Sequence, residues 1–220
     1  MIEAVIFDMD GVLIDSIPLW FEAKIKSFKK VGIDLTYEMC FQSTGLKVNE
    51  MVDYWYDKFP WDNIPKKEIE EDIMDNVVGL VKEKGVAISG TEYILDFFRE
   101  KKVKIGLASS SQMRLIDVAI EKMGIKKYFD DIYSAEFEKK GKPDPAIYLS
   151  SARSLGIAPK ECIAFEDSLN GLLSAKSAGM KCICIPDEAL IKDEKLKMAD
   201  LVLKSLNDFN EESWNEFNRE

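Results

Sequence analysis

The chain has 220 residues, of which 46% are hydrophobic and 32% are charged, so it can bury a sizeable core as one large domain or as a large domain with a smaller one. Its formal net charge of −10 repels nucleic acids and acidic membranes. It contains no histidine, which excludes Ser-His-Asp catalysis, histidine-ligated zinc and imidazole acid–base chemistry. Carboxylates, hydroxyls, lysines or a metal ion must therefore carry out any chemistry.

The N-terminal segment Met1–Phe7 lacks a basic region, and no apolar run approaches the roughly 18 residues of a membrane span. We therefore expect a cytoplasmic, monomeric protein that binds neither nucleic acid nor membrane. A protein in that compartment keeps its thiols reduced, and the cysteines show no C-x-x-C spacing, so we expect them to pack in the core. They are Cys40, Cys162, Cys182 and Cys184.

Short apolar runs recur along the chain, and each is a predicted buried strand. They are Ala4 to Phe7, Val103 to Ala108, Ile132 to Ser134, Cys162 to Phe165, Cys182 to Ile185 and Leu201 to Leu203. After residue 90 they alternate with helical patterns, the last of which is closed by Gly179. The alternation predicts an α/β protein with a doubly wound parallel sheet.

Between the first two predicted strands lie about ninety residues, far more than a crossover connection needs. Residues 18–84 show apolar side chains at helical spacing throughout. We therefore predict a small α-helical cap domain at residues 17–85, inserted into a core made of residues 1–16 and 86–220. The last stretch, residues 207–220, is predicted to be either a docked final helix or a frayed tail.

Two carboxylates follow the first predicted strand. Asp8 and Asp10 leave its C-terminal end together, in Asp8-Met9-Asp10-Gly11, and ligands bind at that end of open parallel sheets. Two neighbouring acids are costly to keep ionised unless a cation lies between them, and oxygen ligands of this kind suit Mg²⁺. A solvated acidic turn is the alternative interpretation of this motif alone.

Hydroxyl groups follow the second predicted strand, and a lysine follows the third. Ser109 lies at the strand tip, and Ser110 and Ser111 precede a helical stretch. Hydroxyls and free N–H groups at such a place suit an anion, although helix capping explains Ser110 or Ser111 equally well. Lys142 comes before Pro143-Asp144-Pro145, whose prolines fix the chain, so that its ammonium can be held beside a phosphate oxygen.

The fourth predicted strand runs into Glu166-Asp167-Ser168, again with acids at a C-terminal strand end. A helix cap would also explain Asp167 on its own. Four successive strand ends, however, offer carboxylates, a hydroxyl, a lysine and a further carboxylate. One metal ion and one phosphate would use all of them, which indicates a single site.

In order along the chain, these residues resemble the four motifs of the haloacid dehalogenase superfamily: an Asp-x-Asp, a Ser or Thr, a Lys and a late acidic pair. The resemblance covers nearly the whole chain, and a helical insertion after the first motif marks the subgroup with phosphoglucomutase-like and sugar-phosphatase members. More closely, the chain looks like the phosphatases of 2-deoxyglucose 6-phosphate and of hexitol phosphates. The segments that carry this likeness are Phe7 to Ser16, Pro18-Leu19-Trp20, Gly45-Leu46-Lys47 and Val52-Asp53-Tyr54-Trp55.

The resemblance implies a mechanism. Asp8 would attack phosphorus and form an acyl phosphate, while Asp10 protonates the leaving alkoxide and then deprotonates the hydrolytic water. Mg²⁺ would be held by the carboxylates of Asp8 and Asp167 and the backbone carbonyl of Asp10, with Glu166 as an optional further ligand.

The resemblance also implies which residues bind the substrate. Ser109 and Ser110, with neighbouring N–H groups, and Lys142 would balance the charge of the phosphoryl group. Lys47 is expected to contact the substrate from the cap.

Some positions depart from the family patterns. The β-phosphoglucomutase members carry a histidine near the position of Trp20, which argues against a mutase. Ile17 replaces a Glu common in the closest phosphatases and Lys47 replaces an Arg, so the choice of substrate within that group stays open. Trp20 and Trp55 are expected to pack in the structure rather than to bind sugar.

The sequence thus predicts a Mg²⁺-dependent phosphatase of a small phosphate monoester, a sugar or sugar-alcohol phosphate of the 2-deoxyglucose-6-phosphate or hexitol-phosphate type. The alternative is a β-phosphoglucomutase-type phosphomutase, which would use the same aspartates but return the phosphoryl group to a sugar. A signalling receiver, which also accepts phosphate on an aspartate, fits less well, because receivers carry the acceptor after a later strand and need no large cap.

Overall fold

The computed structural model describes residues 1–186 and 190–218. Within that part of the chain, six parallel strands form one sheet in the spatial order β3-β2-β1-β4-β5-β6. The strands are β1 (Ala4–Phe7), β2 (Lys104–Ser109), β3 (Asp131–Ser134), β4 (Cys162–Glu166), β5 (Lys181–Cys184) and β6 (Leu201–Val202). The order of the strands reverses between β1 and β4, which leaves a crevice beyond the carboxyl ends of this pair.

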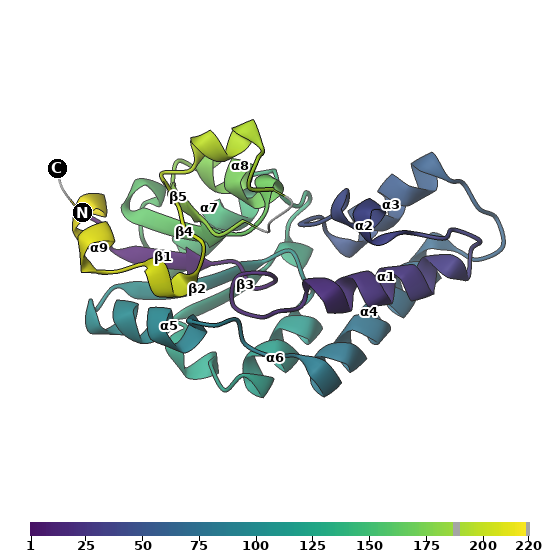
Figure 1. Cartoon of the computed structure of the whole chain (residues 1–220), viewed down its shortest axis with the longest axis horizontal. Coiled ribbons are helices and arrows are strands. Elements are labelled where there is room, and N and C mark those ends of the chain that lie inside the picture. The colour runs from purple at the N-terminus through teal and green to yellow at the C-terminus, as the bar shows by residue number, and fades with distance from the viewer. Residues whose placement is uncertain (187–189, 219–220) are drawn as a thin grey trace.

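Helices cover both faces of the sheet (Figure 1). These helices are α5 (Thr91–Glu100), α6 (Met113–Lys122), α7 (Ala146–Leu155) and α8 (Leu169–Ser177). Short 3₁₀ turns occur at Lys126–Tyr128, Ala135–Phe137, Pro159–Glu161, Glu194–Met198 and Leu206–Asp208. Because side chains alternate along a strand, those of β1 belong to two apolar clusters. Val5 and Phe7 pack with α5 and α6. Ala4 and Ile6 pack with α7 and α8. The predicted doubly wound α/β fold is confirmed.

Two strands begin and end one residue away from their predicted limits. β2 runs one residue later than predicted, so that Ser109 is its last residue, and β5 runs one residue earlier, beginning at Lys181. Pairing with a neighbour, rather than local composition, decides these limits. Ser109 pairs with Ser134 of β3, and Lys181 pairs with Ile163 of β4.

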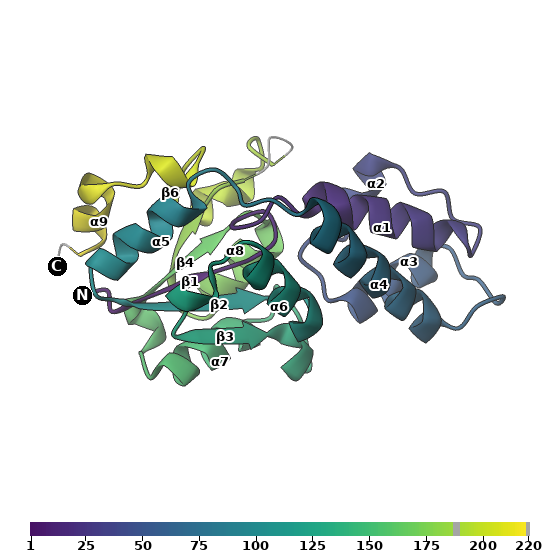
Figure 2. The same cartoon turned by 90° about the horizontal axis from the view of Figure 1, so that it is seen from below.

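Between β1 and α5, where every residue is described, the chain forms four helices, called the cap helices below. They are α1 (Ile17–Lys29), α2 (Tyr37–Phe41), α3 (Val48–Lys58) and α4 (Lys66–Lys84). They lie beyond the carboxyl ends of the strands, opposite the two chain termini (Figures 1 and 2). Phe28 packs edge-on against Trp55 and Trp61, with ring centroids 6.4 and 6.0 Å apart. The domain limits at residues 16–17 and 85–86 stay a prediction.

The C-terminal stretch contains a docked helix, α9 (Glu211–Phe217). The Asn210 side chain caps it by accepting from the amide of Glu212 at 2.9 Å. Phe209 and Phe217 are buried, and the Phe209 ring lies 5.3 Å from that of Phe98. Of the two predictions for this stretch, the docked helix is therefore correct up to residue 218, and residues 219–220 lie outside the described part.

The cysteines are buried free thiols, as the packing prediction requires. No helix within residues 1–186 and 190–218 has the length and apolar character needed to cross a membrane.

Candidate active site

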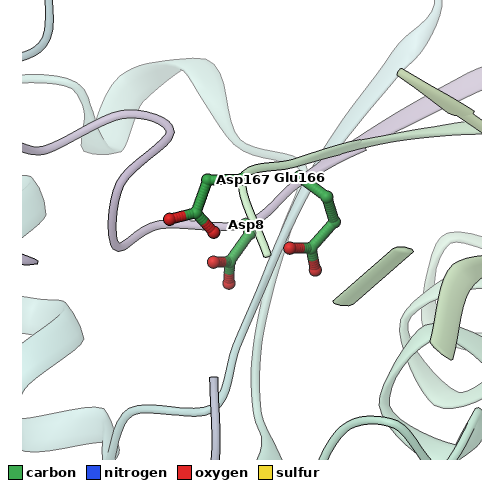
Figure 3. Close-up of side chains that lie close together, drawn as sticks. All are labelled: Asp8, Glu166 and Asp167. Carbon is green, nitrogen blue, oxygen red and sulfur yellow. The ribbon is translucent and has the colours of Figure 1, made fainter. Parts of the chain in front are cut away.

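The register of the two central strands brings three predicted carboxylates together. Phe7 of β1 lies beside Phe165 of β4, so the next residues, Asp8 and Glu166, lie side by side at the carboxyl ends of the two strands. The Asp8 amide donates to the Phe165 carbonyl at 3.0 Å and extends the ladder. Asp167 follows, and carboxylate oxygens of Asp8, Glu166 and Asp167 lie within 4.8 Å of one another (Figure 3).

Lys142 is the cation of this cluster. Its Nζ lies 2.8 Å from Asp8 Oδ1 and 2.6 Å from Glu166 Oε1, and its side chain is 1% exposed. The Tyr148 hydroxyl donates to the same Glu166 oxygen. Glu166 therefore holds Lys142 in place beside Asp8, which is a role in positioning whether or not it also meets a metal ion.

Burial acts strongly on the ionisation of these groups. It raises the pKa of Asp8 to about 7, although Lys142 acts in the opposite direction. Burial and the Asp8 charge hold the pKa of Asp167 well above its usual range. Burial disfavours the Lys142 ammonium, but Asp8 and Glu166 outweigh it and hold the pKa of Lys142 above its ordinary value.

One ammonium does not balance the charge of three buried carboxylates. A divalent cation between them would remove the excess negative charge, and a donor set made only of carboxylate oxygens suits a hard cation. The buried acidic cluster of Asp8, Glu166 and Asp167 is thus chemically fit to bind a metal ion.

Asp10 lines the same cavity as Asp8 and Asp167. Its Oδ1 accepts hydrogen bonds from the Ser16 hydroxyl at 2.6 Å and the Trp20 indole N–H at 2.9 Å. Its Oδ2 accepts from the hydroxyls of two serines at the end of β2, one of which is Ser109 at 3.3 Å. The other is Ser111 at 2.7 Å. These bonds fix the orientation of the Asp10 carboxyl group.

The sequence prediction missed two of these donors and gave a third only a packing role. From the sequence, Ser16 has no assigned role, Ser111 stays open between anion binding and helix capping, and Trp20 is expected only to pack. Trp20 is indeed 9% exposed, but its N–H meets Asp10. One signal was available, because Ser16 and Trp20 are four residues apart at the start of α1 and share a helix face.

A tight turn carries the chain from Asp10 towards α1. Gly11 adopts φ +80°, a left-handed conformation that favours glycine, and a Cβ there would lie 2.0 Å from Asp167 Oδ2. Its amide donates to the Ile14 carbonyl at 3.0 Å. Glycine at this position therefore lets Asp167 approach the turn that carries Asp10.

The remaining predicted site residues lie at the boundary between the cap helices and the core. The Ser110 hydroxyl donates to the Gly45 carbonyl at 2.8 Å, and Ser110 also lines the cavity. Lys47 Nζ donates to the Glu138 carbonyl at 2.6 Å. Lys47 lines a separate depression next to Ser110 and not the cavity that contains Asp8. The structure thus gathers Asp8, Ser110 and their neighbours around one cavity and leaves the Lys47 ammonium outside it.

The cap helices stand closely over the carboxylates. The cavity between them has a volume of about 40 Å³, which is room for no more than a few water molecules. Trp20 and Met51 line it on the cap side, opposite Asp8 and Asp167. A phosphorylated metabolite therefore fits only if the cap helices move outward or if it also occupies the larger hollow of about 590 Å³ that shares Thr44 and Asp167 with this cavity.

An open parallel sheet with carboxylates, hydroxyls and an ammonium gathered where its strand order reverses is the arrangement of an α/β enzyme. Comparison with protein families identifies which one. The haloacid dehalogenase-like hydrolase family matches residues 5–185 of this chain. The chain therefore belongs to this family, as its four motifs predicted.

Curated relatives within the family agree. Hexitol phosphatase B of Escherichia coli K12 is 34% identical over 204 residues, which cover 92% of each protein. A phosphorylated carbohydrates phosphatase of Thermotoga maritima is 35% identical over 185 residues, covering 82% of this chain and 83% of that protein. Taken with the family, these relatives identify the chain as a phosphoric monoester hydrolase.

Solved structures share the whole fold. β-Phosphoglucomutase from Clostridium difficile matches with a TM-score of 0.85 and 30% identity, over 99% of this chain and 97% of that one. CbbY from Rhodobacter sphaeroides, in complex with phosphate, matches with a TM-score of 0.84 and 26% identity, over 94% and 95% of the two chains. The phosphoglucomutase-like subgroup predicted from the sequence is confirmed.

Proposed function

We propose that this protein is a Mg²⁺-dependent phosphatase of sugar or sugar-alcohol phosphates, of the hexitol-phosphate or 2-deoxyglucose-6-phosphate type. The observation that carries the proposal is the buried cluster of Asp8, Asp167 and Lys142, whose two carboxylates line one cavity together with Asp10. The likeness to hexitol phosphatase B and to the Thermotoga enzyme supports the substrate class. Residence in the cytoplasm and a monomeric state are parts of the proposal that rest on the sequence alone.

Asp8 is the nucleophile in this mechanism. A bond forms between its carboxylate oxygen and phosphorus while the bond from phosphorus to the ester oxygen breaks. Asp10, oriented by Ser16 and Trp20, donates a proton to the leaving alkoxide and later takes one from the water that hydrolyses the acyl phosphate. Covalent catalysis of this kind replaces one difficult displacement by two easier ones.

The surrounding residues balance the charge. Mg²⁺, when bound by the carboxylates of Asp8 and Asp167 and the carbonyl of Asp10, supplies positive charge against the phosphate. Lys142 holds its ammonium beside Asp8 and stabilises the transferring phosphoryl group, with the Ser109 hydroxyl as a further donor.

The cap helices exclude bulk water while the acyl phosphate forms. Ser110 and Lys47 help to hold the cap helices closed. Both make cap-to-core hydrogen bonds, through Gly45 and Glu138 respectively. In this proposal Ser110 also reaches the phosphate, whereas contact of Lys47 with the substrate stays a prediction from the sequence.

The test is an assay of the purified protein for release of inorganic phosphate from a panel of phosphorylated sugars and polyols with Mg²⁺. We expect hexitol phosphates and 2-deoxyglucose 6-phosphate to give the highest kcat/KM. Asp8→Asn should abolish turnover, because an amide is neither the nucleophile nor an anionic ligand. Near-normal phosphate release by that variant would reject the covalent mechanism.

A phosphomutase is the second candidate, favoured by the fold shared with β-phosphoglucomutase over 99% of this chain. It would use Asp8 and Asp10 in the same way but return the phosphoryl group to a sugar. The distinguishing experiment supplies β-glucose 1-phosphate with a hexose bisphosphate and follows both products. We expect inorganic phosphate, and accumulation of glucose 6-phosphate in its place would favour the mutase.

A further inference from the structure

Lys24 is a buried cation that the mechanism above does not use. It lies in the middle of α1, is 2% exposed, and lines the cavity between the cap helices and the catalytic carboxylates. Its Nζ is 5.3 Å from the centroid of the Phe21 ring. The Cys40 carbonyl and the Ser43 hydroxyl accept from it at 3.4 and 3.5 Å. Both contacts are longer than a normal N–H to oxygen hydrogen bond, so the ammonium is weakly satisfied.

The charge of Lys24 has no direct counter-charge in the described protein. Within residues 1–186 and 190–218, no carboxylate oxygen lies within 4.0 Å of its Nζ. Burial lowers the pKa of Lys24 to about 8, so most molecules still carry the charge at neutral pH. A buried, unpaired ammonium is costly for the fold, and such groups are concentrated at functional sites.

A second polar group on the same wall also lacks a partner. Thr44 lines the cavity, and its Oγ1 is buried without a hydrogen-bond partner among the described residues. Ser43, by contrast, already accepts from the Trp55 indole N–H at 3.2 Å. Lys24 and Thr44 together therefore offer unused hydrogen-bonding capacity to whatever occupies the cavity.

We propose that Lys24, with Thr44 beside it, binds hydroxyl oxygens of the substrate's sugar or polyol part and so selects polyhydroxy phosphates over alkyl and aryl phosphates. This inference rests on the proposed function and names the residue that recognises its substrate. An ammonium offers three donors to hydroxyl oxygens, whereas an alkyl chain would leave it unpaired in a dry site. A site built to hydrogen-bond a hydroxyl discriminates strongly against an analogue that lacks one.

The place of Lys24 in the cavity fits this role. Asp10 faces the ester oxygen in the proposed mechanism, and its charge acts on Lys24 across the cavity. A substrate whose ester oxygen meets Asp10 would therefore have its neighbouring carbon atoms in the cavity that Lys24 also lines. Lys47, the cap residue expected from the sequence to contact the substrate, instead has its ammonium bound to the Glu138 carbonyl outside the cavity.

The experiment compares two substrates of equal carbon number, a hexitol 6-phosphate and n-hexyl phosphate, with the wild type and Lys24→Met. Methionine keeps an unbranched side chain of similar size without donors. We expect the substitution to lower kcat/KM for the hexitol phosphate by about tenfold or more and for hexyl phosphate by less than about twofold. Lys29→Met, which removes an exposed lysine from the same helix, should change neither value.

Equal losses on both substrates would place Lys24 with the phosphoryl group or the fold, and no loss would remove it from the site, so either result overturns the inference. Lys24→Gln, which keeps a polar side chain, is measured in parallel so that a folding defect in Lys24→Met does not decide the outcome. A wild type that releases phosphate from neither substrate nor from p-nitrophenyl phosphate would reject the proposed function itself, and the inference with it.

Discussion

Asp8 and Asp10 are two residues apart but meet different partners. Asp8 is buried against the Lys142 ammonium, whereas Asp10 accepts from neutral donors, two of which are Ser16 and Trp20 at the start of α1. Two carboxyl groups in two environments can take two roles. In the proposed mechanism, one attacks phosphorus and the other transfers protons.

This difference predicts the behaviour of Asp10→Asn. The amide cannot protonate the leaving group, so kcat for hexitol phosphates should fall by roughly a hundredfold or more. Phosphorylation by p-nitrophenyl phosphate, whose leaving group needs no strong acid, should fall much less. Steady-state kinetics with both substrates checks this, and equal losses on both would remove Asp10 from the acid role.

The burial of Lys24 leads to a prediction about the stability of the fold that does not depend on turnover. Burial lowers its pKa from 10.5 to about 8, so between these values the unfolded chain binds the proton that the folded chain has released. The free energy of unfolding therefore rises with pH across this window. Below pH 8 the buried charge lowers the free energy of unfolding by its full amount. Lys24→Met should raise the free energy of unfolding at pH 7 by on the order of 2 kcal/mol.

Urea denaturation of both proteins at pH 7 and pH 10 measures this difference. The advantage of Lys24→Met should shrink at the higher pH, because the wild-type lysine is then neutral when folded. A variant that is less stable than the wild type at pH 7 would show that Lys24 stabilises the fold through its contacts with the Cys40 carbonyl and the Ser43 hydroxyl.

Among the structural elements, residues 43–50, called the cap loop here although they end in the first turn of α3, contact three core segments around the cavity. The contacts are Asn170 Nδ2 to the Thr44 carbonyl at 3.1 Å, Ser110 Oγ to the Gly45 carbonyl at 2.8 Å, Lys47 Nζ to the Glu138 carbonyl at 2.6 Å and the Gly141 amide to Glu50 Oε1 at 2.8 Å. The core partners follow β2, β3 and β4, whose ends also carry the site. Closure of the cap loop and assembly of the site are therefore linked.

Lys47→Ala should weaken this closed arrangement. Loss of one hydrogen bond of about 1 kcal/mol should lower kcat/KM roughly fivefold. Because the bond joins the cap loop to a core carbonyl outside the cavity, hexitol phosphates and p-nitrophenyl phosphate should be affected alike. A loss confined to the hexitol phosphates would instead show that Lys47 meets the sugar, as the sequence alone suggested.

For the whole molecule, the excess of buried negative charge couples stability to pH and to metal ions. Burial raises the pKa of Asp8 from 3.8 to about 7, so across this window the folded chain holds a proton that the unfolded chain has released. In chelator, this group therefore lowers the free energy of unfolding as pH rises from about 4 to about 7.

Mg²⁺ should reverse that loss, since it binds the ionised carboxylates and competes with protons. At saturating Mg²⁺ we expect the Tm to rise by roughly 5 °C or more at pH 8 relative to EDTA, and by less at pH 5. Differential scanning fluorimetry with Mg²⁺ and with EDTA, at each pH, measures this change in Tm. Asp8→Asn should remove most of the increase in Tm. A wild-type Tm that does not change with Mg²⁺ at pH 8 would contradict the metal assignment.

The parts of the site that could be predicted from the sequence are those set by strand ends. Asp8, Ser109 and Asp167 directly follow or end buried runs, and parallel strands bring such positions to one edge of the sheet. Lys142 could be placed because prolines follow it. These positions depend on the chain's local pattern and on the order of the strands, both of which are visible in the sequence.

The remaining residues depend on how the cap helices sit against the core. Lys24 lies among the apolar residues of α1 and would ordinarily be assigned to solvent, and Ser111 would be assigned to a helix cap. Only the closed arrangement turns Lys24 into the cavity and brings Trp20 to Asp10. Lys47 shows the reverse case, because its position in the cap loop suggested the substrate but its ammonium reaches a core carbonyl.

The bond between Trp20 and Asp10 has an optical consequence. Trp20 lies in α1 and meets Asp10 of the core, whereas Trp55 lies in α3, Trp61 lies between α3 and α4 and packs on Phe28 of α1, and Trp214 lies in α9. An outward swing of α1 would part the indole from a carboxylate and change the colour and yield of its ultraviolet emission. Trp20 is thus an intrinsic fluorophore at the boundary between the cap helices and the core. Rapid-mixing fluorescence spectroscopy can therefore measure the rates at which the cap helices open and close, without an added dye.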